Sequence, residues 1–199
     1  MLKIYKCKRD ASHTKTEEFE FGAGFPVHYF ENDEFDEDGF LKEFSEVLSK
    51  MDFNGKIIIE LGRSIVADCG YYITKVVDKK TNKEQNYAIL DGGINHLVYY
   101  GQSMAMKIPK CEIYPKKNKT EEKWNLCGSL CTINDILVKQ YPSGKLEIGD
   151  VFIFKNTGAY CVTEGISLFL SRKLPAVLKI KNNKIELIRN NLDTYKLNM

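Results

Sequence analysis

The chain has 199 residues, of which 43% are hydrophobic and 12% aromatic, so it is long enough for one large domain or one and a half small ones. This composition excludes disordered and collagen-like chains. Lysine and arginine number 29 and aspartate and glutamate 27, and the formal charge of +2 is too small to indicate a nucleic-acid or membrane-surface partner. No apolar run approaches the roughly 20 residues of a bilayer span, and residues 1–15 lack the apolar region of a signal peptide. We therefore expect a cytoplasmic protein.

The cysteines agree with that compartment. Without an export signal, we expect free thiols at all six positions: Cys7, Cys69, Cys111, Cys127, Cys131 and Cys161. Cys127 and Cys131 form a single C-x3-C, and no second ligand pair stands at a zinc-like spacing. We therefore expect no metal site.

The first predicted elements form a strand–helix–strand unit. Residues 19–26 read FEFGAGFP, an apolar alternation that runs into a glycine-rich turn, as at the end of a strand. After Asn54-Gly55 the run Lys56–Glu60 is almost entirely apolar, which is typical of a strand buried in a parallel sheet. Between them a 3.6-residue apolar period predicts an amphipathic helix through Phe40, Leu41, Phe44, Val47, Leu48 and Met51. Together these elements make a βαβ unit.

An acidic stretch at residues 31–38 precedes the predicted helix. Such a stretch could be an interaction tail. Acidic side chains just before a helix also favour its positive N-terminal end. We expect the second, structural role.

Beyond Arg63 the pattern changes to short strands separated by Gly, Pro, Asn and Lys clusters. This pattern predicts an antiparallel sandwich or barrel, and the boundary between the two parts lies near residues 64–71. Asn182-Asn183 suits a tight hairpin, because asparagine tolerates positive φ. The predicted strands are Tyr71–Val77, Tyr87–Leu90, Cys111–Tyr114, Val151–Lys155, Ala176–Ile180 and Lys184–Ile188.

Two segments of the βαβ unit could recognise an anionic ligand. Gly22-Ala23-Gly24 ends a strand, where small residues let backbone N–H groups approach a phosphate, although such a turn is often only a turn. Glu60-Leu61-Gly62-Arg63 leaves the buried strand at its C-terminal end, the edge at which α/β sheets place their sites. Its carboxylate and guanidinium could hold the two ends of one ligand, or they could pair with each other.

Three further segments carry reactive groups in the β-rich part. Asp91-Gly92-Gly93 and Asn156-Thr157-Gly158-Ala159-Tyr160 each end a predicted strand, where either could be simple turn chemistry. Cys131 lies in the segment CGSLCTIND, close to where a helix could start. A thiol there could have a lowered pKa, although an inert buried cysteine is the commoner case.

In order, GAGFP, ELGR, DGG, C-x3-D and GAY resemble the series found in the C-terminal half of the fold-type III, pyridoxal-phosphate-dependent decarboxylases, which have an alanine-racemase-like barrel. This group includes diaminopimelate, ornithine and arginine decarboxylases, and the resemblance runs from about Phe19 to Leu178. It implies a mixed α/β plus all-β fold. Residues 1–66 would be a remnant of the last βα units of a (β/α)8 barrel, and residues 67–199 an antiparallel β-sandwich or β-barrel domain. It also implies pyridoxal 5′-phosphate as cofactor and an amino acid as substrate.

The resemblance also implies roles for single residues. Gly22, Ala23 and Gly24 would give N–H groups to the cofactor phosphate, and Gly62 and Arg63 would complete that site. Glu60 would pair with the pyridinium nitrogen, so that the ring can accept the electrons left by departing CO₂. Tyr160 would also approach the cofactor.

On the substrate side, Asp91 matches a family aspartate near the substrate amine, and Asp135 matches a second substrate-site acid. Cys131 matches the cysteine that returns a proton to the substrate carbon. In the family this cysteine reaches the neighbouring subunit's site across a two-fold dimer.

The departures from the family pattern bear mainly on the substrate. Leu61 replaces a proline and leaves the charged groups of that segment unchanged. Thr132 replaces an acid that recognises the distal end of the substrate, and a threonine cannot form an ion pair with a distal ammonium. The segment Asn95–Gln102 resembles a loop of the diaminopimelate branch without its arginine. We expect His96, in that segment, to be a loop or core residue.

No segment matches the family's Schiff-base lysine, and His13 lies too close to Gly22 for the family's ring-stacking histidine. We therefore expect a fragment, a split-gene half or a degenerate relative of a diaminopimelate-type decarboxylase of lysine biosynthesis. It would act as a homodimer, or as a heteromer with a polypeptide that supplies the lysine. The alternative is a non-catalytic dimerisation or regulatory partner of a complete decarboxylase, but retention of Glu60, Arg63, Cys131 and Tyr160 favours the enzyme.

Overall fold

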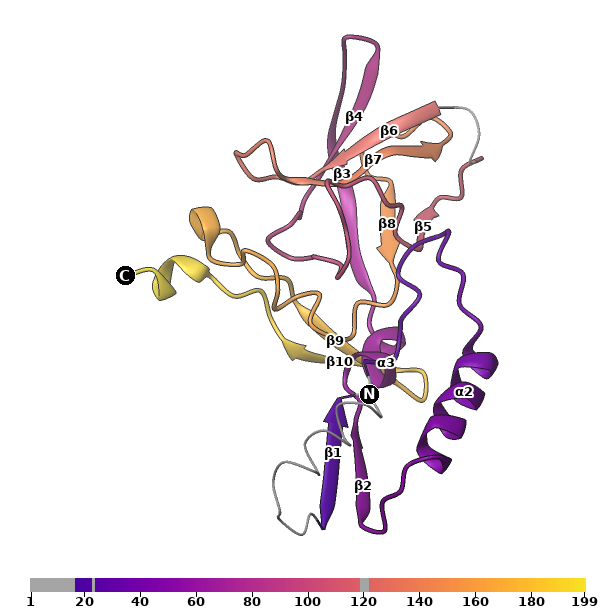
Figure 1. Cartoon of the computed structure of the whole chain (residues 1–199). Coiled ribbons are helices and arrows are strands. Elements are labelled where there is room, and N and C mark those ends of the chain that lie inside the picture. The colour runs from indigo at the N-terminus through magenta and orange to yellow at the C-terminus, as the bar shows by residue number, and fades with distance from the viewer. Residues whose placement is uncertain (1–16, 23, 119–121) are drawn as a thin grey trace. The chain divides into compact units, whose positions relative to one another are not determined.

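The computed structural model describes residues 17–22, 24–118 and 122–199 and groups them into two compact units (Figure 1). The first unit contains the described residues up to Val27 together with Glu34–Ile65. The second contains His28–Asp33 and Val66–Met199. No helix in the described part of the chain is long and apolar enough to cross a membrane.

The first unit has the predicted strand–helix–strand order: β1 (Glu18–Gly22), α2 (Glu37–Ser49) and β2 (Lys56–Glu60), with α3 (Arg63–Val66) beginning just after β2. β1 and β2 pair in parallel, and Glu18 stands opposite Lys56. The Lys56 Nζ–Glu18 Oε1 distance of 3.1 Å makes this cross-strand ion pair consistent with that register. Two strands do not define a barrel, so the barrel origin of this unit remains a prediction.

Helix α2 begins where the acidic stretch predicts. The side chain of the N-cap residue Asp36 accepts a hydrogen bond from the Gly39 N–H at 3.0 Å, and Glu37 and Asp38 occupy the first turn. The helix ends at Ser49, before Met51, the last residue of the predicted apolar stripe. Thus the acidic residues support the helix start, as expected.

Phenylalanine rings join α2 to β1. Phe44 lies 6.1 Å from Phe21 and 5.2 Å from Phe25, measured between ring centroids. Phe40 lies 5.0 Å from Phe25. Even so, none of the described residues of this unit falls in the buried class. The aromatic side chains therefore do not enclose a dry core within this unit.

The second unit is built on a six-stranded sheet with the order β5-β8-β3-β4-β6-β7. Its strands are β3 (Tyr72–Asn82), β4 (Gln85–Leu90), β5 (Cys111–Tyr114), β6 (Glu122–Cys127), β7 (Ile136–Ser143) and β8 (Val151–Phe154). A separate hairpin pairs β9 (Val177–Lys181) with β10 (Lys184–Arg189). Short 3₁₀ turns lie at Ala67–Cys69, Phe169–Ser171 and Thr194–Leu197.

The sheet curls because β3 changes partner along its length. Tyr72–Lys75 pair with β8, and from Val76 onward the strand pairs with β4, with a register shift between Val76 and Asp78. β4 and β6 run parallel, so the sheet is mixed and the expectation of an antiparallel sandwich or barrel is wrong in this respect. The 31 residues between these two strands are long enough for the crossover that a parallel pair requires.

The sequence patterns missed β6 and β7, because polar residues interrupt the apolar runs of both strands. Asn125 of β6 is 4% exposed. Its Nδ2 donates to the Asn86 carbonyl of β4 at 3.3 Å, and its Oδ1 accepts the Gln140 N–H of β7 at 3.3 Å. By contrast, the predicted Asn182-Asn183 turn is confirmed, since both residues have positive φ, 51° and 59°.

The core of the second unit lies against this sheet. Its largest fully buried side chains include Tyr141, Phe152, Phe154, Leu90, Leu97, Leu126, Leu146, Val76 and Val138. Tyr141 and Phe152 meet edge to face at a centroid distance of 5.7 Å. The sheet therefore carries the core of the second unit.

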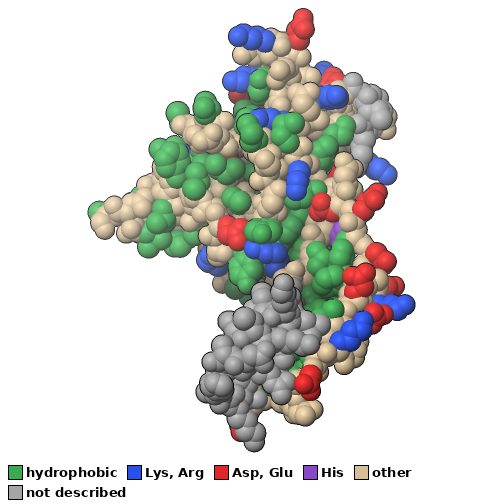
Figure 2. Space-filling view, viewed as in Figure 1, with side chains coloured by type: hydrophobic (Ala, Val, Ile, Leu, Met, Phe, Trp, Pro, Cys, Tyr) green, Lys and Arg blue, Asp and Glu red, His purple; other side chains and the backbone are tan. Residues whose placement is uncertain are grey.

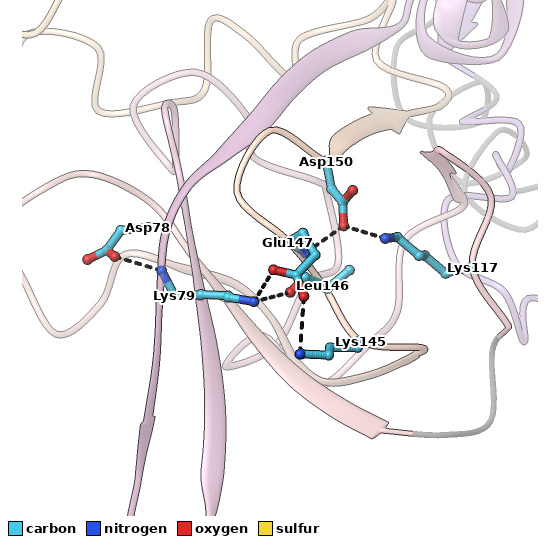
Figure 3. A network of polar contacts seen from close by, with 7 residues as sticks. All are labelled: Asp78, Lys79, Lys117, Lys145, Leu146, Glu147 and Asp150. Carbon is cyan, nitrogen blue, oxygen red and sulfur yellow. Dashed lines mark hydrogen bonds and ion pairs between the residues drawn. The ribbon is translucent and has the colours of Figure 1, made fainter.

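An ionic network fixes the turn between β7 and β8 (Figure 3). The Asp150 carboxylate, 5% exposed, accepts the Glu147 N–H at 2.7 Å and pairs with Lys117 Nζ at 3.0 Å. Lys79 of β3 bonds to both the Glu147 carboxylate and the Leu146 carbonyl. The turn is therefore tied to the segment after β5 and to the central strand β3.

Candidate functional site

The parallel pairing of β1 and β2 places two of the predicted ligand-binding segments at one edge. Gly22, the last residue of β1, stands opposite Glu60, the last residue of β2. The glycine turn and the segment Glu60–Arg63 therefore leave the sheet side by side, at the carboxyl ends of the strands. This is the edge at which α/β sheets place their ligands.

The glycine turn leaves open space beside its backbone. A Cβ atom placed on Gly22 or on Gly24 would meet nothing within 4 Å. Gly24 has a φ of +62°, a conformation that favours glycine. Ala23 lies outside the described residues.

Glu60 has an acidic neighbour that sequence reasoning missed. Glu20 of β1 is exposed, and a hydrogen bond with Glu60 together with repulsion between the two carboxylates raises the pKa of Glu20. The strand alternation could have shown this, since Glu20 lies between Phe19 and Phe21 and must point to the opposite face. The edge therefore carries two interacting carboxyl groups and the arginine that begins α3, Arg63.

In the second unit, Asp91 follows β4 and is exposed. Its Oδ1 accepts the Thr74 hydroxyl at 2.5 Å and the Lys75 N–H at 3.1 Å. These two bonds fix one carboxylate oxygen against β3. The side chain therefore has a fixed position with charge still facing solvent.

Asp135 is a buried acceptor for backbone groups. It is 2% exposed, and its two oxygens accept the Ile94 N–H at 2.8 Å and the Leu130 N–H at 2.7 Å. A Cβ on either Gly93 or Gly128 would lie within 2.3 Å of this carboxylate. Asp135 thus ties the Asp91 loop to the Cys131 loop, and glycines are required on both sides.

Cys131 lies in the loop between β6 and β7 and is exposed. The neighbouring Ile133 is 91% exposed, so this loop projects its tip into solvent. The suggestion that a helix begins near this cysteine is wrong, because the segment leads from one strand to the next. Cys127, at the end of β6, is more buried, and burial raises the pKa of its thiol.

Tyr160 is held in a strained turn. Its φ is +62°, unusual for a residue with a large side chain, and its side chain is 51% exposed. The preceding residues are fixed to the segment after α3, since the Thr157 and Gly158 N–H groups donate to Gly70 and Ala67 carbonyls at 2.9 Å. The ring therefore projects from a rigid backbone.

His96 is buried, as a loop or core histidine would be, with 8% of its surface exposed. Its Nε2 lies 2.7 Å from the Lys173 carbonyl and its Nδ1 lies 2.9 Å from the Tyr72 hydroxyl. The ring therefore donates to the carbonyl and accepts from tyrosine. Burial lowers the pKa of His96 and raises that of Tyr72.

A cavity of about 590 Å³ lies between these loops. Its lining includes Asp91, Asn95, His96, Ser129 and Arg172, whereas Cys131, Asp135 and Tyr160 are not part of it. Arg172 was missed by sequence reasoning because a lone arginine in SRKLP carries no motif. The structure thus brings Asp91 to the same cavity as the base of the cysteine loop.

Comparison with known proteins matches most of this chain to one family. The family model described as pyridoxal-dependent decarboxylase, C-terminal sheet domain, matches residues 5–158. Pyridoxal phosphate is the cofactor of that family.

Three curated relatives illustrate the range of similarity. An L-glutamyl-acyl-carrier-protein decarboxylase of Niallia circulans is 33% identical over 138 residues, which are 66% of this chain and 32% of the relative. A 2-((L-alanin-3-ylcarbamoyl)methyl)-2-hydroxybutanedioate decarboxylase of Staphylococcus aureus is 29% identical and covers 82% of this chain and 43% of the relative. Diaminopimelate decarboxylase of Helicobacter pylori is 28% identical, with coverages of 86% and 41%. The chain spans less than half the length of each.

Among solved structures, diaminopimelate decarboxylase from Helicobacter pylori complexed with L-lysine superposes with a TM-score of 0.77 at 28% identity. The superposition covers 98% of this chain and 47% of that structure. The described fold, with its curled mixed sheet, is therefore the one found in these decarboxylases.

Proposed function

Because this chain belongs to the pyridoxal-dependent decarboxylase family, we propose that it forms the C-terminal part of an amino-acid decarboxylase of the diaminopimelate type. The observation that carries the proposal is the pairing of Gly22 with Glu60. This pairing brings the groups suited to a phosphate and those suited to a ring nitrogen to one sheet edge. Residues 1–66 are proposed as part of the family's barrel and residues 67–199 as its β-domain.

The groups at that edge fit pyridoxal phosphate. The open glycine turn offers backbone N–H groups, and the Arg63 guanidinium adds a cation for the phosphate. The Glu60 carboxylate is the acceptor that a protonated ring nitrogen requires. When bound, the cofactor serves as an acceptor for the electrons left behind when CO₂ departs.

The remaining roles belong to side chains of the second unit. Asp91 would pair with the substrate amine, and Tyr160 would contact the cofactor. Cys131 would hold a proton on Sγ and deliver it to the carbon that has lost its carboxylate, and its place on a projecting loop suits a site in a neighbouring subunit. Asp135 would contribute indirectly to substrate binding, because its carboxylate fixes the two loops.

Within this family, we propose that the substrate differs from diaminopimelate itself and that its distal end carries no ammonium group. The loop from Gly128 to Asn134 contains no carboxylate, and the carboxylate of Asp135 is committed to backbone amides. The glutamyl and citrate-like substrates in the names of two relatives support this class.

The lysine-bearing part of the fold is proposed to come from a second polypeptide in a cytoplasmic assembly. The absence of any buried residue in the described part of the first unit supports a further covering part of the fold, because the phenylalanine cluster of this unit needs more covering surface. Exposed apolar side chains also gather over the C-terminal region, including Phe169, Leu170 and Leu197 (Figure 2). A non-catalytic partner of a complete decarboxylase would present similar surfaces, so the test must include activity.

The test mixes the chain with a candidate lysine-bearing polypeptide and pyridoxal phosphate. We expect the visible absorption band of lysine-bound cofactor, and release of CO₂ from the substrate. Cys131→Ala should keep the band and lose product, whereas Cys69→Ala, which removes another exposed thiol, should keep both. A folded mixture without the band, or full activity of Cys131→Ala, would refute the proposed roles. Co-purification with a complete decarboxylase whose activity the chain lowers would favour the non-catalytic alternative.

A further inference from the structure

The backbone just before Cys131 is held by a residue remote in sequence. Arg172 Nη2 donates a hydrogen bond to the carbonyl of Ser129 at 2.6 Å across a separation of 43 residues. Ser129 stands two residues before Cys131. The same peptide group is held on its other side, because the Leu130 N–H donates to Asp135, whose carboxylate also accepts the Ile94 N–H.

The backbone that carries Arg172 is itself fixed on two sides. The Arg172 carbonyl accepts the hydroxyl of Thr194, a fully buried residue, at 2.7 Å. The next carbonyl, that of Lys173, accepts the ring N–H of His96 at 2.7 Å, and His96 is in turn bonded to Tyr72 of β3. The backbone that carries the Arg172 side chain is therefore held to the sheet by hydrogen bonds.

We propose that Arg172 is a positioning residue for Cys131. It acts through the Ser129 carbonyl, and its role rests on the proposed function of the cysteine as proton donor. Ser129 and Arg172 both line the 590 Å³ cavity that also contains Asp91. The bond between them fixes the loop relative to the carboxylate that would face the substrate amine, and so sets where the thiol points.

The first experiment uses the chain alone, without cofactor or partner. Loss of a hydrogen bond from a charged donor predicts a roughly ten-fold rise in hydrogen exchange of the amides of residues 129–134. We compare Arg172→Gln with Lys173→Gln, which removes one charge from the neighbouring residue and leaves its carbonyl in place. We expect the rise only in Arg172→Gln, an intermediate value in Arg172→Lys, and unchanged exchange in β3 and β8.

Mass spectrometry of alkylated peptides gives a second readout on the same proteins. The alkylation rate of Cys131 should change in Arg172→Gln, while that of the exposed Cys69 stays constant. If Arg172→Gln lowers the stability of the whole sheet, Arg172→Lys serves in its place, with Trp124 fluorescence reporting the fold. Exchange within two-fold of wild type in both variants, or an equal effect of Lys173→Gln, would overturn the proposal.

In the assembled enzyme, Arg172→Gln should lower kcat roughly ten-fold with little change in KM, because it displaces the proton donor without touching the substrate amine. A rise in KM at constant kcat would instead place Arg172 in substrate binding and refute the positioning role. The readouts on the isolated chain do not depend on decarboxylation. If these readouts change as expected while the Cys131→Ala enzyme remains active, the proposed function of Cys131 is refuted and the contact of Arg172 with the loop still stands.

Discussion

Replacing Asp135 by alanine should destabilise the sheet domain by removing one acceptor that serves two loops. The side chain is 2% exposed, and the Ile94 and Leu130 N–H groups would both lose their bonds. A buried amide left without an acceptor costs about 1–3 kcal/mol, so we expect a loss of about 4 kcal/mol for the pair. This is a large part of the roughly 5–15 kcal/mol by which a domain is stable. The midpoint of thermal unfolding should fall by roughly 10 °C.

Urea denaturation followed by the fluorescence of Trp124 measures this loss. Trp124 is the single tryptophan of the chain, and it lies buried in β6, the strand that leads into the Cys131 loop. Asp78→Ala is the matched control, because Asp78 also accepts a backbone N–H, at 2.8 Å, but is exposed. We expect the control to cost less than about 0.5 kcal/mol. An Asp135→Ala variant as stable as the control would refute the assignment of this carboxylate as the link between the loops.

Three further outcomes are expected. Lys117→Met should lower the free energy of unfolding, measured by urea denaturation, by about 3 kcal/mol, because it leaves the buried Asp150 carboxylate without its ion-pair partner. A loss near zero would show that the pair is not formed in solution. Burial lowers the pKa of His96, so the unfolded chain binds the extra proton and the stability of the fold should decrease as the pH drops below about 6.5. His96→Gln should flatten this dependence between pH 7.5 and 5.5. An unchanged slope would exclude His96 as its source. Glu60 raises the pKa of Glu20, so the stabilising protonated form of Glu20 is lost as the pH rises through that pKa. Glu20→Gln should therefore slow hydrogen exchange in β1 and β2 at pH 7 and have little effect at pH 4. Equal effects at both pH values would contradict the coupling.

The local elements were predicted well where their signal is local. Lys56–Glu60 and Cys111–Tyr114 have the predicted bounds, because a short apolar run between breaking residues identifies a strand without reference to its partner. The hairpin at Asn182-Asn183 followed in the same way from residues that accept positive φ. β6 was missed because Asn125 becomes compatible with burial only when β4 and β7 supply its hydrogen bonds.

For the site, the sequence by itself determined the family, because five short motifs in order resemble those of the decarboxylases, and the family model matches residues 5–158. The tertiary structure decided which carboxylate is bonded to backbone amides and which one remains exposed. Asp135 carries the same charge as Asp91, yet burial between two glycines commits its oxygens to backbone amides, while Asp91 remains exposed. Arg172 belongs to no motif, and its contact with Ser129 exists only because the chain returns to the Cys131 loop after 43 residues. Charge and residue type are encoded locally, whereas burial and hydrogen-bond partners depend on which distant segments meet.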